Sequence, residues 1–145
     1  MQISTKGRYA LRAMIDLALH MDQGPVLRKD IAERQEISSD YIGQLFLKLR
    51  KAGFVKSVKG PGGGYVLAQD ADRIRAGDII RAVEGPIALV QCVRPNQGEV
   101  CHRMDGCVTY LLWKKLSKTI EEVLDSITLK DLCDRAREFA EAAQR

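Results

Sequence analysis

Residues 31–65 read IAERQEISSDYIGQLFLKLRKAGFVKSVKGPGGGY, and the predicted fold class depends most on these residues. Ser38 is a favourable N-cap for a helix that continues with a helical apolar period until Gly53 ends it. A shorter helix over 28–34 precedes it, across a tight turn at 35–37. Two short helices joined in this way predict a helix-turn-helix motif.

The second of these helices, expected over 39–51, has one apolar and one polar side. A DNA-reading helix presents its N-terminal residues to base edges and its basic residues to phosphates. Gly43 costs the helix about 1 kcal/mol relative to alanine. It either allows a close approach to a base pair or marks the place of an absent reading side chain. The apolar side holds Ile42, Leu45, Phe46 and Leu49, and the polar side holds Ser39, Asp40, Gly43, Gln44, Lys48 and Lys51.

Two β-rich segments, 54–58 and 65–67, flank a glycine-rich turn and predict a hairpin. Directly after a helix-turn-helix, such a hairpin is a wing. Lys56 and Lys59, with Gly60 at the tip, would then lie along a DNA backbone or enter a minor groove. A phosphate-binding loop is rejected, because no helix follows at once and neither a GxGxxG pattern nor a GK[ST] ending is present.

On either side of this stretch the sequence predicts further helices. Ser4 or Thr5 can cap a first helix that runs to about His20, and a short helix over 76–83 ends at Gly85. Residues 1–70 are thus expected to form a winged helix-turn-helix head, and 71–91 a short helix and connector. The predicted fold class is mainly α with a small β-hairpin wing and a long dimerisation helix.

The charge is uneven although the net charge is only +4. Between Tyr41 and Gln69 there are basic residues and no acidic one, whereas the chain from Ala71 onward is neutral. This distribution indicates a polyanion partner at one face, although a merely solvated charged face is the alternative. Neither a signal peptide nor a membrane-spanning run is visible, so we expect a cytoplasmic protein with reduced thiols.

Residues 91–107, QCVRPNQGEVCHRMDGC, place three of the four cysteines in one turn-rich loop. Cys92, Cys101 and Cys107 can turn toward one point, and thiolates bind iron, iron-sulfur clusters and zinc. Residues 92–107 are therefore expected to form a metal or cluster site, with His102 as a fourth donor if the metal is zinc. Cys133 lies outside the loop, and we expect it to be a small buried hydrophobe.

After the loop, an apolar stripe continues for about five helical turns within 108–145. It is too long for the head alone to cover, which favours pairing with the same helix of a second subunit over core packing within one chain. Two-fold symmetry would suit a palindromic DNA site. Thr128 should cap the last helix, with Asp131 completing a capping box. The stripe consists of Val108, Leu111, Leu112, Leu116, Ile120, Val123, Leu124 and Ile127.

Over essentially its full length the chain resembles the winged-helix regulator family that includes IscR, NsrR, RirA and CymR. The resemblance implies a homodimeric DNA-binding transcription regulator, expected to be a repressor, and not an enzyme. The residues themselves also argue against an enzyme, since no Ser/His/Asp or Cys/His arrangement is recognisable. The matching segments are ISTKGRYALRAMIDLAL, residues 31–65 as quoted above, AGDIIRAVEGPI, LLWKKL and SITLKDL.

The resemblance implies an iron-sulfur cluster, 2Fe-2S or 4Fe-4S, on Cys92, Cys101 and Cys107, which senses iron, cluster status, nitric oxide or redox state. The C-x8-C-x5-C spacing departs from the C-x5-C-x5-C of IscR and NsrR and is closer to the longer loops of RirA-like sequences. IscR-like members take a histidine as fourth ligand where this chain has Tyr110, and NsrR-like members take a carboxylate where it has Arg8. The fourth ligand is therefore expected to be His102, Asp105, Glu99 or an exogenous group, unless the fourth position is open.

The resemblance also assigns DNA contacts. Tyr41 and Gln44 match the family's recognition helix, Gly43 replaces the glutamate that IscR-like members use for site discrimination, and Lys59 stands where they have arginine. Lysine keeps the charge but loses the planar fork. CymR-like members lack the cysteine triad and respond through a partner enzyme of cysteine synthesis, so control by a protein partner, or by zinc or thiol redox at the loop, is the alternative.

Overall fold

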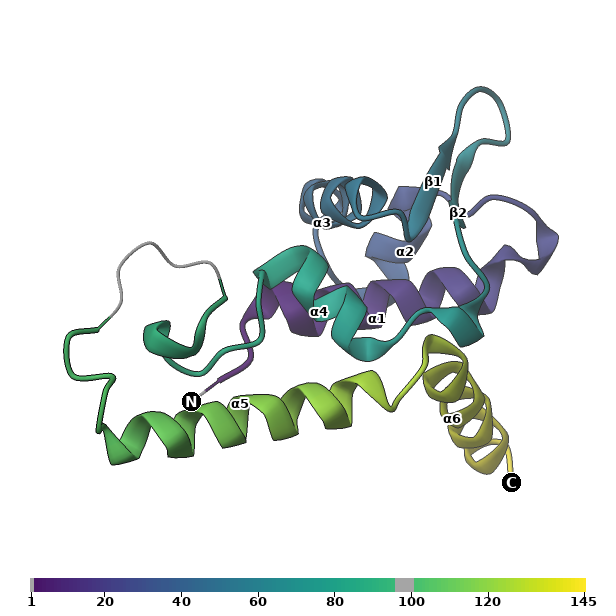
Figure 1. Cartoon of the computed structure of the whole chain (residues 1–145). Helices are drawn as coiled ribbons and strands as arrows, with labels where there is room; N and C mark the ends of the chain where they lie inside the picture. The colour runs from purple at the N-terminus through teal and green to yellow at the C-terminus, as the bar shows by residue number, and fades with distance from the viewer. Residues whose placement is uncertain (1, 96–100) are drawn as a thin grey trace.

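The chain folds into helices and one hairpin, as a computed structural model shows for residues 2–95 and 101–145 (Figure 1). This confirms the prediction of a mainly α fold with a small β-hairpin wing. Along the described residues the elements are α1 (Thr5–His20), η1 (Met21–Gln23), α2 (Arg28–Gln35), α3 (Ser39–Lys51), β1 (Val55–Val58), β2 (Gly64–Leu67), η2 (Ala71–Arg73), α4 (Ala76–Glu84), η3 (Gln91–Val93), α5 (Val108–Asp125) and α6 (Leu129–Ala143).

Local chemistry sets the ends of the two helices in the helix-turn-helix. α2 ends where Glu36 adopts a left-handed conformation, with φ of 56°, and the Ile37 amide then donates to the Ala32 carbonyl at 3.0 Å. The Ser38 hydroxyl accepts from the Tyr41 amide at 3.1 Å, which confirms the predicted N-cap of α3. Gly53, with φ of 87°, follows α3 and turns the chain into the wing.

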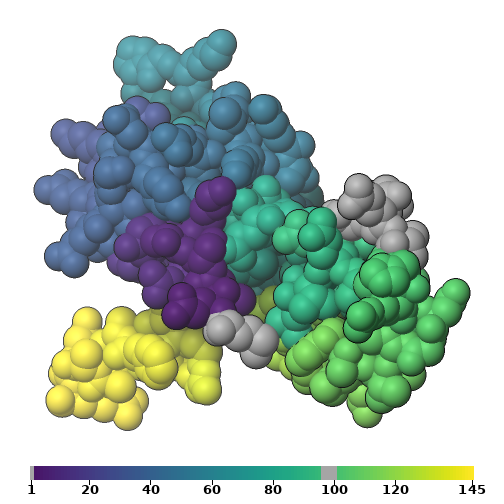
Figure 2. Space-filling view, turned by 90° about the vertical axis from the view of Figure 1, so that its left-hand side faces the viewer, coloured from purple at the N-terminus to yellow at the C-terminus, as the bar shows by residue number. Residues whose placement is uncertain are grey.

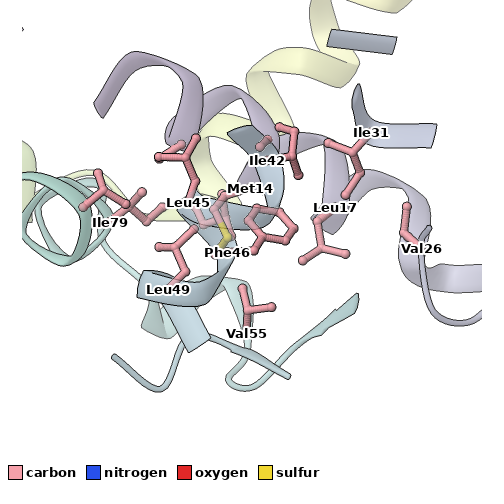
Figure 3. Packing of buried hydrophobic residues seen from close by; sticks show 14 of the residues in the cluster. Met14, Leu17, Val26, Ile31, Ile42, Leu45, Phe46, Leu49, Val55 and Ile79 are labelled. Carbon is pink, nitrogen blue, oxygen red and sulfur yellow. The ribbon is translucent and has the colours of Figure 1, made fainter. Parts of the chain in front are cut away.

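The core lies between α1, α3, α4 and the wing, and it buries the apolar side predicted for α3 (Figure 3). Phe46 is fully buried and meets the Tyr65 ring edge to face, with ring centroids 4.7 Å apart. Leu129 and Cys133 of α6 close the same core, and Cys133 is buried as predicted. One continuous core therefore fixes α3 and the wing relative to α1, α4 and α6.

A buried carboxylate joins α1 to α2. Asp16 is 2% exposed, and the Arg34 guanidinium donates to both of its oxygens, at 2.7 Å from Nη2 to Oδ1 and 2.9 Å from Nε to Oδ2. Gln35 Nε2 donates to Asp16 Oδ2 at 2.9 Å. Hydrogen bonding to Asp16 raises the pKa of Arg34 further. Both Asp16 oxygens accept hydrogen bonds, so this ion pair holds α1 and α2 in one arrangement.

Backbone hydrogen bonds fix where α6 begins. The Leu129 amide donates to the Ile74 carbonyl at 2.7 Å, and the Ala76 amide donates to the Ile127 carbonyl at 2.8 Å. Thr128 and Asp131 form the predicted capping box. Figure 2 shows α5 in green and α6 in yellow along one side of the molecule, with the hairpin tip on the opposite side.

The start of α1 differs from the prediction. Ser4 occupies the N-cap position of α1, but its hydroxyl makes no capping bond and instead donates to the Glu84 carboxylate of α4. The Ser4 amide donates to the same carboxylate at 3.0 Å. A carboxylate from a distant helix competes successfully for the hydroxyl, so Ser4 anchors α4 rather than the first turn of α1. No helix in the described part of the chain is long and apolar enough to cross a membrane.

Candidate nucleic-acid interface and cysteine loop

The outward side of α3 carries the residues that the sequence proposed for DNA contact. Burial of Ile42, Leu45, Phe46 and Leu49 turns this side away from the core. Asp40, Gln44 and Lys51 are exposed there, while Ser39, Tyr41 and Gly43 are half-buried. The side presents hydrogen-bonding groups at the N-terminal end of α3 and basic groups at its C-terminal end, as a helix in a major groove would require.

Aromatic contacts hold Tyr41 against α1. Its ring meets the Tyr9 ring edge to face, with centroids 5.8 Å apart, and the Arg12 guanidinium lies 5.4 Å from the Tyr9 centroid. Arg12 also donates to the Gln35 carbonyl at the turn between α2 and α3. The Arg8 guanidinium lies 5.9 Å from the same Tyr9 ring centroid. These two arginines of α1 therefore extend the basic surface beyond residues 41–69, the segment that the sequence predicted to be basic.

Lys48 differs from its neighbours on α3. Its Nζ lies 3.4 Å from the Val83 carbonyl, at the end of α4, although the side chain is largely exposed. This is a long hydrogen bond at the margin of useful geometry. The position links α3 to α4, and the ammonium can turn outward to a phosphate at little cost.

The wing is fixed to the helices on both of its strands. Val55 of β1 pairs with Leu67 of β2 in an antiparallel register, and Arg50 of α3 donates to the Ser57 hydroxyl at 3.0 Å. Tyr65 exchanges two backbone hydrogen bonds with Val26, at 2.9 and 2.8 Å. Gly64 is required there, because a Cβ would meet the Val26 backbone.

The wing's polar residues project from this anchored base. Lys56, Lys59 and Gly60 are exposed on the hairpin, and Gly60 has a φ of 92° at its turn. Figure 1 shows the hairpin and α3 on the same side of the head, away from α5. The structure thus brings the helix and wing residues proposed for DNA contact to one side of the molecule.

Two features of the α3 surface were not foreseen. Leu47 is 43% exposed on the outward side of α3, where the sequence indicated polar residues. The Arg28 guanidinium, from the first residue of α2, lies over Gly43. A depression of about 190 Å³ lies beside Gly43 and Leu47, and Arg50 also lines it. The outward position of Leu47 could be predicted from the helical period. The contact of Arg28 with Gly43 could not, because no nearby residue in the sequence indicates it.

The cysteine loop begins and ends on structured elements. Cys92 lies in η3 and is half-buried, Cys101 is exposed, and Cys107 occupies the N-cap position of α5. None of the three forms a disulfide with a described residue. His102 and Asp105 are exposed in the same loop, whereas Glu99 lies outside the described residues. Within the described residues no three His, Cys, Asp or Glu side chains converge on a metal position.

The chemistry of these donors nevertheless fits a thiophilic group. The Thr109 hydroxyl lies 3.2 Å from the Cys107 sulfur, and this hydrogen bond, with the Tyr110 amide, lowers the pKa of Cys107. The position at a helix N-terminus favours the anion as well. The thiolate is the form that binds iron and zinc. By contrast, burial raises the pKa of Cys133, consistent with a structural role.

The elements around the loop are tied to the head. The Leu89 amide donates to the buried Ser117 hydroxyl of α5 at 3.1 Å. Arg81 of α4 donates to Asp125 of α5 at 2.5 Å, and hydrogen bonding to Asp125 raises the pKa of Arg81. A Cβ at Gly77 would collide with the Asp125 carboxylate, so glycine permits this approach. α4 is the element that connects α5 to the head.

The stripe predicted on α5 is largely uncovered. Val108, Leu111 and Leu112 are 79%, 64% and 49% exposed, and Val123 is 55% exposed. Ile120 and Leu124 are half-buried toward α4, and Ile127 lies beyond the end of the helix. The head therefore covers one edge of the stripe and leaves the rest open, as the sequence led us to expect.

The chain matches known proteins over most of its length. A family model described as Rrf2, iron-dependent transcriptional regulator, matches residues 3–135. The chain belongs to this family. The transcriptional regulator IscR of Yersinia enterocolitica is 47% identical over 146 residues, spanning 100% of this chain and 86% of the relative. IscR of Serratia proteamaculans is 49% identical over 133 residues, spanning 91% and 79%.

Solved structures named IscR and CymR have the same fold. T. potens IscR is 47% identical, with a TM-score of 0.77 over 95% of this chain and 90% of that one. CymR, the global cysteine regulator of B. subtilis, is 44% identical, with a TM-score of 0.74 over 93% and 98%. The protein is a DNA-binding transcriptional regulator of the IscR/Rrf2 type, and its relatives are regulators rather than enzymes. Both points confirm the sequence-based predictions.

Proposed function

We propose that this Rrf2 protein is a homodimeric repressor whose DNA affinity is set by an iron-sulfur cluster on Cys92, Cys101 and Cys107. The observation that carries the proposal is the placing of these thiols. Cys107 starts α5 with its thiolate favoured, and Cys92 sits in η3, which packs against α5. A group bound by both would link the connector of the head to the helix proposed for dimerisation.

A bound cluster would supply a redox-active, nitric-oxide-reactive centre. Donors for a fourth ligand remain His102 and Asp105, together with Glu99. Two hydrogen bonds would transmit a change at the cluster to the head: Leu89 donates to Ser117, and Arg81 donates to Asp125. Any shift of the start of α5 relative to η3 therefore acts on α4, which packs against both α1 and α3.

The domain limits follow the same scheme. Residues 1–70 form the DNA-binding head, and residues 71–91 connect the head to the cysteine loop. Residues 92–107 hold the cluster, and residues 108–145 form the dimer contact. The uncovered stripe on α5 supports the dimer, because exposed leucines at helical spacing are buried at an interface in stable proteins. Two heads related by a two-fold axis would read a palindromic site.

For DNA, we propose that the N-terminal part of α3 reads bases in the major groove. Its contacts are Ser39, Asp40, Tyr41, Gly43 and Gln44. The phosphate contacts are Lys48, Lys51, Lys56, Lys59 and Gly60. A basic wing and a polar helix on one side of the head support this assignment (Figure 1).

The deciding measurement for the cofactor is an absorption spectrum with iron, sulfide and zinc counts on protein purified without oxygen. We expect brown protein with equal iron and sulfide, and loss of the colour in Cys101→Ala with an unchanged far-UV spectrum. Cys133→Ala is the matched control and should keep the cluster, since Cys133 belongs to the core. Colourless protein with one zinc per chain would contradict the cluster.

A second function is favoured by the similarity to CymR, named as a cysteine regulator. In that case a protein partner, such as an enzyme of cysteine synthesis, or thiol redox at the loop controls DNA binding. Metal-free protein that binds DNA tightly, and whose affinity changes only with the partner or with oxidation, would establish this function instead.

A further inference from the structure

The outward side of α3 has a gap in the row of side chains that faces away from the core. Asp40, Gln44 and Leu47 carry side chains there, whereas Gly43 between them carries none. On a helix these positions are three and four residues apart, so they share one side. The gap lies beside the depression of about 190 Å³.

The guanidinium of Arg28 fills this gap. A Cβ built on Gly43 would overlap Arg28 Nη1 and lie 3.4 Å from both its Cδ and its Cζ. Arg28 is the first residue of α2, and its side chain is exposed. The glycine therefore lets a side chain from another helix reach the middle of the α3 surface.

Arg28 has no competing partner in the described part of the chain. Arg34 is bound to Asp16 and Arg50 to Ser57, whereas Arg28 makes no hydrogen bond or ion pair with any described residue. Its five donors remain available, and a guanidinium binds guanine O6 and N7 as a fork. A lysine would lack this geometry.

From this geometry we infer that Arg28 reads a guanine in each half-site, through the gap at Gly43. The inference rests on the proposed docking of α3 in a major groove, and it adds a specificity residue from α2. It also gives Gly43 a role, as the residue that admits the guanidinium.

The test is a selection from randomised half-sites with the full-length protein, followed by binding titrations on the selected site and on its single-base variants. Arg28→Ala should abolish a guanine preference at one position per half-site, by about 5- to 150-fold, and leave the other positions unchanged. Arg28→Lys should lose most of the same preference, because the charge alone does not reproduce the fork. Lys29→Ala, next to Arg28 on the exposed part of α2, is the matched control and should keep the preference.

Gly43→Ala supplies an independent arm, because its methyl group displaces the guanidinium without removing a charge. It should weaken the same position, and the double variant with Arg28→Ala should lose no more than Arg28→Ala alone. An equal loss on all sequences, restored by Arg28→Lys, would make Arg28 a phosphate contact and overturn the inference. An unchanged preference in Arg28→Ala would also overturn it while leaving the proposed function intact. If the wild-type protein selected no site, both would fail.

Discussion

On α3, Leu45 and Leu49 are buried in the core, whereas on α5 the leucines at positions 111, 112 and 116 are exposed. The two helices are similar in their apolar periodicity, so the difference lies in what each packs against. α3 lies in a core built from α1, α2, α4 and the wing, while α5 rests mainly on α4 and η3. The head is complete within one chain, and the α5 region requires something more to cover it.

The largest expected effect tests whether the core around α3 is closed within one chain. Phe46→Ala removes a fully buried ring from the core and should lower the free energy of unfolding by about 3 to 5 kcal/mol. Phe139→Ala, at a position on α6 that is 71% exposed, should change it by less than about 0.5 kcal/mol. Urea unfolding at one protein concentration measures both. Similar losses in the two variants would contradict a single closed core in the head.

The next effect concerns the open side of α5. Leu112→Asp places a carboxylate on the stripe, and if the stripe is a dimer contact the dimer should weaken at least about 100-fold. Leu27→Asp is a matched control, since Leu27 is 48% exposed and Leu112 is 49% exposed. Sedimentation measures the association, and circular dichroism verifies the fold. Unchanged association in Leu112→Asp would mean that another surface joins the subunits.

A smaller effect concerns the connection between the two regions. Arg81→Ala removes the 2.5 Å contact to Asp125, and we expect a loss of about 1 to 2 kcal/mol in the free energy of unfolding. Arg135→Ala should have almost no effect, because Arg135 and Glu138 form an exposed pair. A stronger effect at Arg135 than at Arg81 would show that α4 is not the main link between α5 and the head.

The features that were predicted from the sequence depend on local contacts, whereas those that were missed depend on contacts between distant residues. The bounds of α3, its Ser38 cap and the capping box at Thr128 depend on neighbours within a few residues, so local pattern located them. The bond from Ser4 to Glu84, the pair of Arg81 with Asp125 and the contact of Arg28 with Gly43 join distant parts of the chain. Helical periodicity carries no information about such partners. The open stripe on α5 was predictable because it is too long for so small a head.

The cysteine loop was predictable in composition but not in arrangement. Three thiols in a turn-rich segment indicate a thiophilic site from residue type alone. Which atoms meet depends on the path of a loop with no repeating period, and on a ligand that is itself part of the site. The sequence therefore named candidate ligands without establishing how they come together.

The smallest expected effect is a difference in reactivity between the thiols of Cys107 and Cys133, measured without changing the fold. Hydrogen bonds at the start of α5 lower the pKa of Cys107, whereas burial in the core raises the pKa of Cys133. Because the thiolate is the reacting form, alkylation of metal-free protein should begin at lower pH for Cys107 than for an ordinary thiol, and at higher pH for Cys133. Mass spectrometry of iodoacetamide-treated protein across a pH series gives both midpoints.

Thr109→Val removes the first cause of the Cys107 shift. Its Cys107 midpoint should rise toward that of a free cysteine, while the Cys133 midpoint should stay in place. A Cys107 midpoint that did not move would contradict the role of the Thr109 hydroxyl and would leave the backbone amides and Arg103 as the causes of the lowered pKa. Equal midpoints for Cys107 and Cys133 would mean that the core opens as readily as the loop. The contrast between the closed core and the accessible start of α5 would then fail.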